Sequence, residues 1–190
     1  MTIARTCRRT IRRFGAPGAI RELTFSCYHQ YPLIERADLY GDLARVIGRA
    51  CARHGYELLC FVIMPDHVHL VVRALEGASG IAVLLQAIKR PTSYRGHLEI
   101  HRRDPRLSLH LTRFRGDRKP AFRLWQAGPG YDRNLVSSRS SRASIDYLHR
   151  NPVRKGLVGQ AADWPWSSFR QFGGLPRLVD GLPEITLFEG

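Results

Sequence analysis

Two apolar runs separated by a short polar break stand out in the first half of the chain. The break is Met64-Pro65-Asp66. Its proline presets a turn dihedral and its aspartate offers local hydrogen bonds, so the two runs predict a β-hairpin. In the second run, His67 and His69 alternate with apolar residues. Because successive strand side chains point to opposite faces, the two imidazoles are predicted to share one face.

The rest of the chain shows the periodicities of further strands and helices. β-rich, alternating segments predict strands, and apolar residues spaced three and four apart predict helices. Gly55 occupies a helix C-cap position, and Pro91 is expected to end the second helix. In chain order the predicted elements are a strand at 21–30, a helix at 34–54, strands at 56–64 and 67–74, a helix at 81–90, a strand at 122–126 and a helix at 138–151.

This order of elements predicts an α+β fold with the split βαβ topology of ferredoxin-like proteins. The sheet is expected to be mainly antiparallel, with the strand of His67 and His69 inside it and helices on one face. Residues 92–120 lack periodicity and are rich in arginine, so we predict an irregular segment that faces DNA. The chain is expected to comprise a basic N-terminal arm (1–20), one globular domain (21–172) and a C-terminal tail (173–190).

Composition and charge indicate the class of molecule that the protein binds and the compartment in which it works. The chain has 190 residues and a net charge of +14, and nearly all of its cations are arginines, which favours nucleic acid as the partner. The four cysteines show neither metal-site nor disulfide spacing, which is typical of a reducing compartment. No apolar run is long enough to cross a membrane and no signal peptide is evident, so we expect a cytoplasmic protein.

Two pairs of side chains suggest one reactive site. Imidazoles on one strand face can bind a divalent metal ion, although the same spacing also occurs at ordinary sheet positions. Tyr147 and Asn151 lie four residues apart and therefore share a helical face. Asn151 offers an amide oxygen as a third ligand, and Tyr147 offers a phenol that can attack a phosphate. Two imidazoles and an amide oxygen suit Mg²⁺ or Mn²⁺, while Cys60 on the preceding strand leaves zinc open.

Three segments, MPDHVHLVV, IDYLHRNPVRKGLV and DWPWSSFR, carry a resemblance to a known family. Over residues 21–172 the chain resembles the REP-associated tyrosine transposases, a branch of the single-tyrosine HUH transposases, and the GYDR at Tyr131 also resembles that family. The resemblance implies a ferredoxin-like catalytic domain that cleaves and rejoins single-stranded DNA with a foldback hairpin through a 5′-phosphotyrosine intermediate. It also implies that His67, His69 and Asn151 bind the metal and that Tyr147 is the nucleophile.

Some alternatives stay open at this stage. Tyr131 competes as the nucleophile, but the residue four positions later is Leu135, which cannot bind metal, so Tyr147 is favoured. Trp164, Trp166 and Phe169 could stack on unpaired bases, although such a cluster more often anchors a C-terminal segment to the core. The sequence does not decide between a monomer and a homodimer.

The cations near these residues are candidate DNA contacts. Arg150, Arg154 and Lys155 flank the predicted tyrosine helix, where phosphate contact is expected. Lys89 and Arg90 end the second helix, where a cation equally suits the helix dipole. Two other functions are alternatives: a catalytically silent hairpin-DNA-binding regulator, and an RNA-binding ferredoxin-like module, which would need exposed aromatic residues on its central strands.

Overall fold

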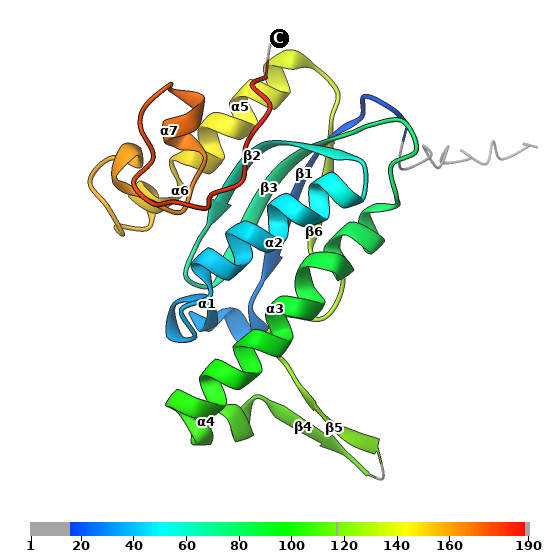
Figure 1. Cartoon of the computed structure of the whole chain (residues 1–190), viewed down its shortest axis with the longest axis vertical. Coiled ribbons are helices and arrows are strands. Elements are labelled where there is room, and N and C mark those ends of the chain that lie inside the picture. Colours follow the sequence, from blue (N-terminus) through cyan, green and yellow to red (C-terminus); the bar gives the residue numbers. More distant parts are fainter. Residues whose placement is uncertain (1–15, 117, 189–190) are drawn as a thin grey trace, which may run out of the picture.

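The computed structural model describes residues 16–116 and 118–188, so most of the predicted N-terminal arm (1–20) lies outside the described residues. At the centre is a four-stranded antiparallel sheet in the order β2-β3-β1-β6 (Figure 1). The sheet consists of β1 (Ile20–Ser26), β2 (Tyr56–Ile63), β3 (His67–Ala74) and β6 (Tyr131–Leu135). The helix α2 (Tyr40–Arg53) connects β1 to β2, and α3 (Ile81–Arg103) follows β3, which confirms the split βαβ prediction.

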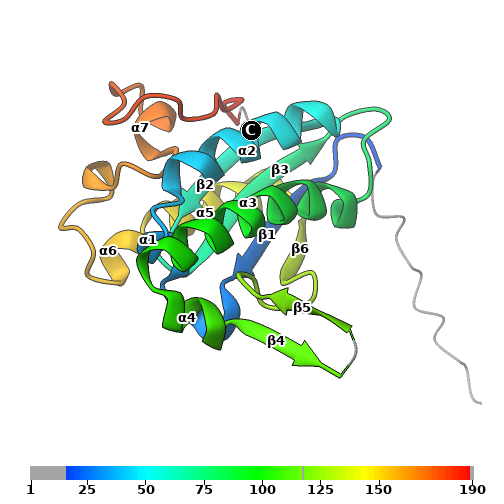
Figure 2. The same ribbon diagram turned by 60° about the horizontal axis from the view of Figure 1, so that its bottom comes forward.

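The predicted hairpin is confirmed, and β3 lies inside the sheet between β2 and β1. Alternate residues of these strands enter two separate cores. On one face, strand residues such as Leu23, Phe25 and Leu70 pack with the apolar sides of α2 and α3. Figures 1 and 2 show these two helices side by side over that face. The apolar residues recur at helical spacing on α2, so burying them together against the sheet stabilises this arrangement.

The second face of the sheet carries α5 (Ser138–His149). Ile145 and Leu148 of this helix pack with Cys60, Val62 and Val71 from β2 and β3 in a smaller core. The prediction of helices on one face is therefore correct for α2 and α3 and wrong for α5. This face of β3 carries His67, His69 and Arg73 beside one apolar residue, Val71, so its sequence pattern does not predict that a helix covers it.

The prediction that Pro91 ends the second helix is wrong, because α3 continues through it to Arg103. Proline removes one backbone donor and crowds the preceding turn. Neighbouring contacts supply other hydrogen bonds: the Thr92 hydroxyl donates to the Ile88 carbonyl at 2.8 Å, and the Trp125 indole N–H donates to the Lys89 carbonyl at 3.2 Å. Trp125 is distant in sequence, so only tertiary structure reveals this support.

Residues 92–120 are largely regular, contrary to the prediction. They comprise the rest of α3, the short helix α4 (Pro105–His110) and a two-stranded ribbon of β4 (Thr112–Arg115) and β5 (Arg118–Phe122). Figure 2 shows this ribbon projecting beside α4, away from the main sheet.

The prediction of a strand at 122–126 is also wrong, because the fourth strand of the main sheet is β6. Four of the five β6 residues are exposed, so this edge strand lacks the apolar alternation that identifies a strand.

Short elements complete the chain. The helix predicted at 34–54 is interrupted at Asp38, which has a φ of 52°, and the first strand ends at Ser26 rather than residue 30. The helix predicted at 138–151 ends at His149, and Pro152 lies in the first turn of the next short helix. The remaining elements are η1 (Tyr28–Gln30), α1 (Leu33–Arg36), α6 (Asn151–Arg154), η2 (Ala161–Asp163) and α7 (Phe169–Phe172).

The Trp-Pro-Trp segment lies along β2. The Trp164 indole donates to the Ile63 carbonyl at 3.1 Å, and the Trp166 ring stacks on Tyr40 with 5.2 Å between ring centroids. Ser167 also forms an isolated bridge with Val62. These contacts confirm that the tryptophans anchor the C-terminal segment. Among the helices that the structure describes, none combines the length and apolar character needed to cross a bilayer.

Gly130, at the entrance to β6, permits a close backbone approach. Its φ is +80°, and a Cβ there would lie 2.1 Å from the Thr24 carbonyl oxygen. We expect Gly130→Ala to lower the free energy of unfolding by at least about 1–3 kcal/mol, measured by urea denaturation, because β6 must shift or strain.

Gly128→Ala is the matched control for this prediction. Gly128 also has a positive φ, of +96°, but a Cβ there would meet nothing within 4 Å. The control measures the effect of the dihedral strain without the clash. Equal losses of unfolding free energy in both variants would contradict the close-approach argument.

Candidate active site

His67 and His69 lie on the sheet face that carries α5, as their spacing predicts. Their Nε2 atoms are 2.9 Å apart and their ring centroids 4.6 Å apart. Across the sheet, Thr24 of β1 is in register with both His69 of β3 and Tyr131 of β6. Since residues in register share a face, a histidine, a threonine and a tyrosine form one row.

Each histidine has a second polar partner at its other ring nitrogen. The His67 Nδ1 lies 2.6 Å from an Asp66 carboxylate oxygen, and the His69 Nδ1 lies 2.8 Å from the Thr24 hydroxyl. Burial raises the pKa of Asp66, but the hydrogen bond and the charge of His67 outweigh it, so this pKa lies below its usual value. Asp66 is therefore ionised at neutral pH. When His67 is neutral, Asp66 accepts the N–H of its Nδ1, and the lone pair of His67 Nε2 then faces His69.

His69 is held in the neutral form. Burial, with a smaller contribution from His67, lowers the pKa of His69 to about 3, and only 8% of the residue is exposed. Thr24 can accept or donate, so it suits either tautomer of the neutral ring. A neutral imidazole whose second nitrogen is hydrogen-bonded is the usual state of a metal-binding histidine.

The donor set fits a divalent cation. Two nitrogen ligands at right angles, each about 2.1 Å from one ion, would be about 3 Å apart, which matches the Nε2 separation. Among the described residues no group of three His, Cys, Asp or Glu side chains could hold a metal ion, so a third protein ligand would have to be of another type. Asn151 has its amide nitrogen directed to the Tyr147 and Leu148 carbonyls, at 3.3 and 3.4 Å, which keeps its amide oxygen available.

Asn151 begins the short helix α6. The charge of Lys155, which caps α6, contributes to lowering the pKa of Asp66. The hydrogen bond from Asn151 to the Tyr147 carbonyl also preserves the one-turn relationship of these two residues, although the α5 helix ends between them.

Tyr147 faces an open cavity of about 640 Å³ between α5 and the sheet. A capping box of Ser137 and Ser140 begins α5, and the buried Ile145 and Leu148 fix its orientation, so Tyr147 remains half exposed. The cavity is lined by Glu22, Thr24, His69, Tyr131, Arg133, Ser140, Ala143, Ser144 and Tyr147. The structure therefore brings the predicted nucleophile and one predicted metal ligand to the same cavity.

Comparisons with known proteins point in the same direction. The family described as "Transposase IS200 like" matches residues 21–110, which include the histidine hairpin. A Haemophilus influenzae protein provisionally named a REP-associated tyrosine transposase is 25% identical over 134 residues, 70% of each chain. The chain resembles the REP-associated tyrosine transposases. An Escherichia coli protein of that name is 22% identical over 116 residues, which are 61% of this chain and 56% of that protein.

A solved structure of a REP-associated tyrosine transposase, bound to a REP hairpin, has the same fold. Its TM-score is 0.65, with 22% sequence identity and 93% of each chain covered. The transposase-like fold therefore extends beyond the matched residues 21–110 to α5 and α6, which carry Tyr147 and Asn151.

The rival tyrosine lies in the same cavity of this transposase-like core. Tyr131 and Tyr147 are each 50% exposed, and both line the cavity with His69. Leu135, four residues after Tyr131, is buried in the second core. By position in the cavity, either phenol could be the nucleophile. Tyr147 differs from Tyr131 in having an amide side chain, that of Asn151, four residues later.

The candidate DNA-binding cations fall into two groups. Arg150 and Arg154 line a depression of about 330 Å³ next to Tyr147, and the Arg154 guanidinium carbon lies 4.4 Å from the Tyr147 ring centroid. Lys89 instead donates to the Gly128 carbonyl at 3.0 Å, and Arg90 lines a groove between α2 and α3. The structure therefore brings Arg150 and Arg154 to the tyrosine, but not Lys89 and Arg90.

Cys60, the residue that left zinc open, is not among the described residues that line the cavity of Tyr147 and His69. It is fully buried in the second core, where its sulfur lies 3.4 Å from His149 Nε2, and burial raises the pKa of its thiol to about 12. Burial also lowers the pKa of His149 to about 4, and its Nε2 lies 2.9 Å from the Ser168 hydroxyl. His149 points away from Tyr147, as expected from its helical position. Burial keeps the Cys60 thiol protonated at neutral pH.

Sequence reasoning missed a polar group at the floor of the cavity. The Glu22 carboxylate accepts hydrogen bonds from the Ser144 hydroxyl at 2.7 Å and from Arg133 at 2.6 Å. Glu22 and Thr24 alternate on the first strand, so their common face was predictable. That this face is the histidine face depends on strand register, which the sequence did not reveal.

Proposed function

We propose that this chain is a transposase-type nuclease and strand transferase that cleaves and rejoins single-stranded, hairpin-forming DNA. The observation that carries the proposal is the cavity shared by Tyr147 and His69. The match to IS200-like transposases and the resemblance to REP-associated tyrosine transposases support the reaction class. A REP hairpin bound to the structural relative supports a foldback hairpin as substrate. The catalytic unit in this proposal comprises residues 21–172, with an N-terminal arm (1–20) and a C-terminal tail (173–190) outside it.

Tyr147 is the nucleophile in this proposal. Its phenolic oxygen forms a bond to phosphorus, the bond from phosphorus to the 3′ oxygen breaks, and the proton lost by the phenol is balanced by one gained by the leaving 3′-OH. The product is a 5′-phosphotyrosine linkage with a free 3′-OH. Because the linkage retains the phosphodiester energy, the 3′-OH of another strand can reverse the step without ATP.

His67, His69 and Asn151 would hold Mg²⁺ or Mn²⁺ beside the scissile phosphate. When bound, the ion supplies Lewis-acid stabilisation of the charge that develops on the phosphate oxygens. Asp66 and Thr24 orient the two imidazoles through their Nδ1 atoms, at 2.6 and 2.8 Å. Residues that fix ring orientation in this way typically strengthen metal binding by about 10–100-fold, and we expect an effect of that size here.

Arg150, Arg154 and Lys155 would contact substrate phosphates next to the nucleophile. Arg150 and Arg154 line the depression beside Tyr147, and Lys155 follows on the same segment. Arginine can bind phosphate through two parallel hydrogen bonds, which positions the strand as well as attracting it. Lys89 and Arg90, on the other side of the sheet, would not contact the scissile strand.

Incubation with an end-labelled hairpin oligonucleotide that carries a single-stranded flank tests the proposal. With Mg²⁺ or Mn²⁺ we expect a covalent protein–DNA product that resists denaturation, together with a shortened strand ending in a 3′-OH. With EDTA we expect DNA binding without cleavage. Binding without any covalent product in either metal ion would favour a silent DNA-binding regulator.

We also expect DNA binding to weaken steeply with salt. The net charge is +14, and contact with about 5–8 phosphates of a single strand would give a log–log slope of roughly −3.5 to −6. Fluorescence anisotropy over a KCl series measures this slope. A slope near zero would contradict the nucleic-acid interpretation.

A further inference from the structure

A second basic hollow lies on the opposite side of the sheet from the Tyr147 cavity. It is a groove of about 530 Å³ between α2 and α3, here called the α2/α3 groove. Three arginines line it: Arg49 and Arg53 from α2, and Arg90 from α3. Its floor is apolar, and no acidic residue is among the described residues that line it.

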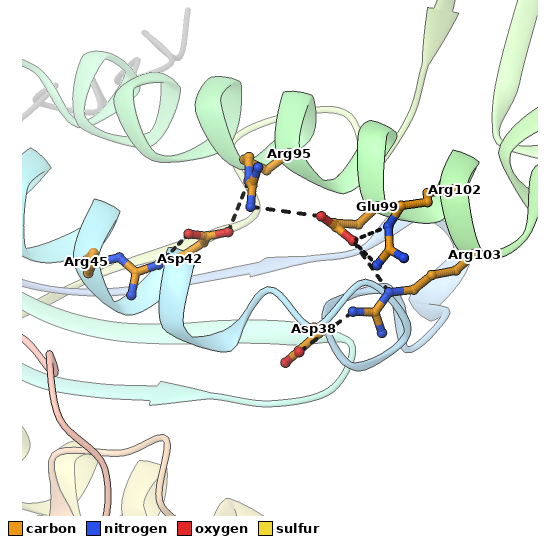
Figure 3. Close-up of polar contacts among 7 residues, drawn as sticks. All are labelled: Asp38, Asp42, Arg45, Arg95, Glu99, Arg102 and Arg103. Atoms are coloured by element: carbon orange, nitrogen blue, oxygen red, sulfur yellow. Dashed lines mark hydrogen bonds and ion pairs between the residues drawn. The ribbon is translucent and has the colours of Figure 1, made fainter.

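The same two helices also carry arginines that are neutralised. Figure 3 shows a network at the other end of the pair, in which Arg45 and Arg95 meet Asp42 at 2.5 and 3.3 Å. In the same network Arg102 lies 2.9 Å from Glu99, and Arg103 lies 3.5 Å from it. This end of the helix pair is therefore largely balanced in charge, with three carboxylates (Asp38, Asp42 and Glu99) against four arginines.

The groove end of the helix pair has no such balance. Within the described part of the chain, Arg49, Arg53 and Arg90 have no ion pair or hydrogen bond to an acidic side chain, and all three are exposed. Three like charges over one groove repel each other and raise the local positive potential, an arrangement that an anionic ligand would relieve.

The character of the groove favours duplex DNA over an unpaired strand. Proteins that bind single strands use exposed aromatic side chains on which bases stack. The Tyr147 cavity has two such residues, Tyr131 and Tyr147, whereas the described residues of the α2/α3 groove include no Phe, Tyr or Trp. The one aromatic ring among these described lining residues, that of His54, lies with its Nδ1 3.3 Å from the Ser79 hydroxyl. Cations without a stacking platform suit the regular phosphate backbone of a duplex.

We propose that the α2/α3 groove is a second DNA-binding site, which takes the phosphate backbone of a duplex through Arg49, Arg53 and Arg90. The inference rests on the proposed function for the identity of its ligand as DNA. The site is sequence-independent, because its arginines contact phosphates, and phosphate contacts carry no sequence information. It lets the protein hold a duplex segment on one side while an unpaired strand enters the Tyr147 cavity on the other.

The test compares two triple variants of the full chain with equal change in net charge. The groove variant is Arg49→Gln/Arg53→Gln/Arg90→Gln, and the matched control is Arg45→Gln/Arg102→Gln/Arg103→Gln in the neutralised network. Affinity for a blunt duplex without single-stranded ends is measured over a KCl series in EDTA. We expect the groove variant to flatten the log–log slope by about 2.7, since each lost contact to B-DNA removes about 0.9. The control should change the slope by less than about 1, because its arginines are already paired.

An unstructured single strand serves as the second ligand. The groove variant should lose less affinity for it than for the duplex. Equal losses of duplex affinity in both triple variants, or an unchanged slope in the groove variant, would overturn the site, and an equal loss for both ligands would overturn its preference for duplex. Circular dichroism confirms that each variant is folded. The assay requires no cleavage, so failure of the Tyr147 chemistry and failure of the groove give different results.

Discussion

Tyr147→Phe should eliminate the covalent protein–DNA adduct while leaving the protein folded and able to bind DNA. The change removes one oxygen from a side chain that is half exposed, and the aromatic ring that Arg154 contacts at 4.4 Å remains. Denaturing gel electrophoresis of labelled hairpin DNA with Mg²⁺ measures the adduct. Because the phenol is the reacting group, the loss should be complete and should not depend on metal concentration.

Tyr131→Phe is the matched control, since Tyr131 is equally exposed and lines the same cavity. It should still form the adduct. Adduct from Tyr147→Phe but none from Tyr131→Phe would identify Tyr131 as the nucleophile and remove the reason to pair Tyr147 with Asn151.

Asn151→Ala should have a different phenotype from Tyr147→Phe. Loss of a ligand weakens metal binding without removing the nucleophile, so raising the Mn²⁺ concentration should recover part of the cleavage rate. Recovery of cleavage at high Mn²⁺ therefore identifies a metal ligand, and the absence of recovery identifies the nucleophile.

His67→Ala or His69→Ala should abolish detectable cleavage, a loss of roughly 10²–10³-fold or more, because an active-site metal ion contributes several kcal/mol to charge stabilisation. Most DNA affinity should remain, since arginines supply the phosphate contacts. Cleavage rates and anisotropy measured on the same preparations separate the two effects.

His101→Ala is a suitable control for the histidine variants. This histidine is exposed on the last turn of α3, away from the sheet. The His101→Ala variant should cleave DNA at the same rate as the unmodified chain. Cleavage that survives both His67→Ala and His69→Ala in metal-free buffer would mean that the catalytic site lies elsewhere.

The local half of the site was predictable from the sequence. The alternation around His67 and His69 placed both imidazoles on one strand face, and the observed Nε2 separation of 2.9 Å agrees with that prediction. The order of strands and helices predicted the split βαβ topology, and the turn chemistry of Met64-Pro65-Asp66 located the hairpin. These features depend on residues close in sequence, whose geometry is fixed by backbone periodicity.

Predictions failed where distant contacts override local preference. Pro91 should end a helix, but Trp125 and Thr92 supply hydrogen bonds that support its continuation. The Tyr131–Leu135 segment, four of whose five residues are exposed, has little strand character of its own, and pairing with β1 makes it a strand. Propensity is a weak guide in both cases because tertiary hydrogen bonds and packing are worth as much as the local preference.

The sequence by itself determined the topology, the shared face of His67 and His69, and the one-turn relationship of Tyr147 to Asn151. The tertiary structure decided that α5 covers the histidine face, that Thr24 and Tyr131 lie in one row with His69, and that the arginines divide between two sides of the sheet. The physical reason is strand register and helix docking. Both are set by how buried side chains from distant segments fit together, and that fit is not encoded in the spacing of neighbouring residues.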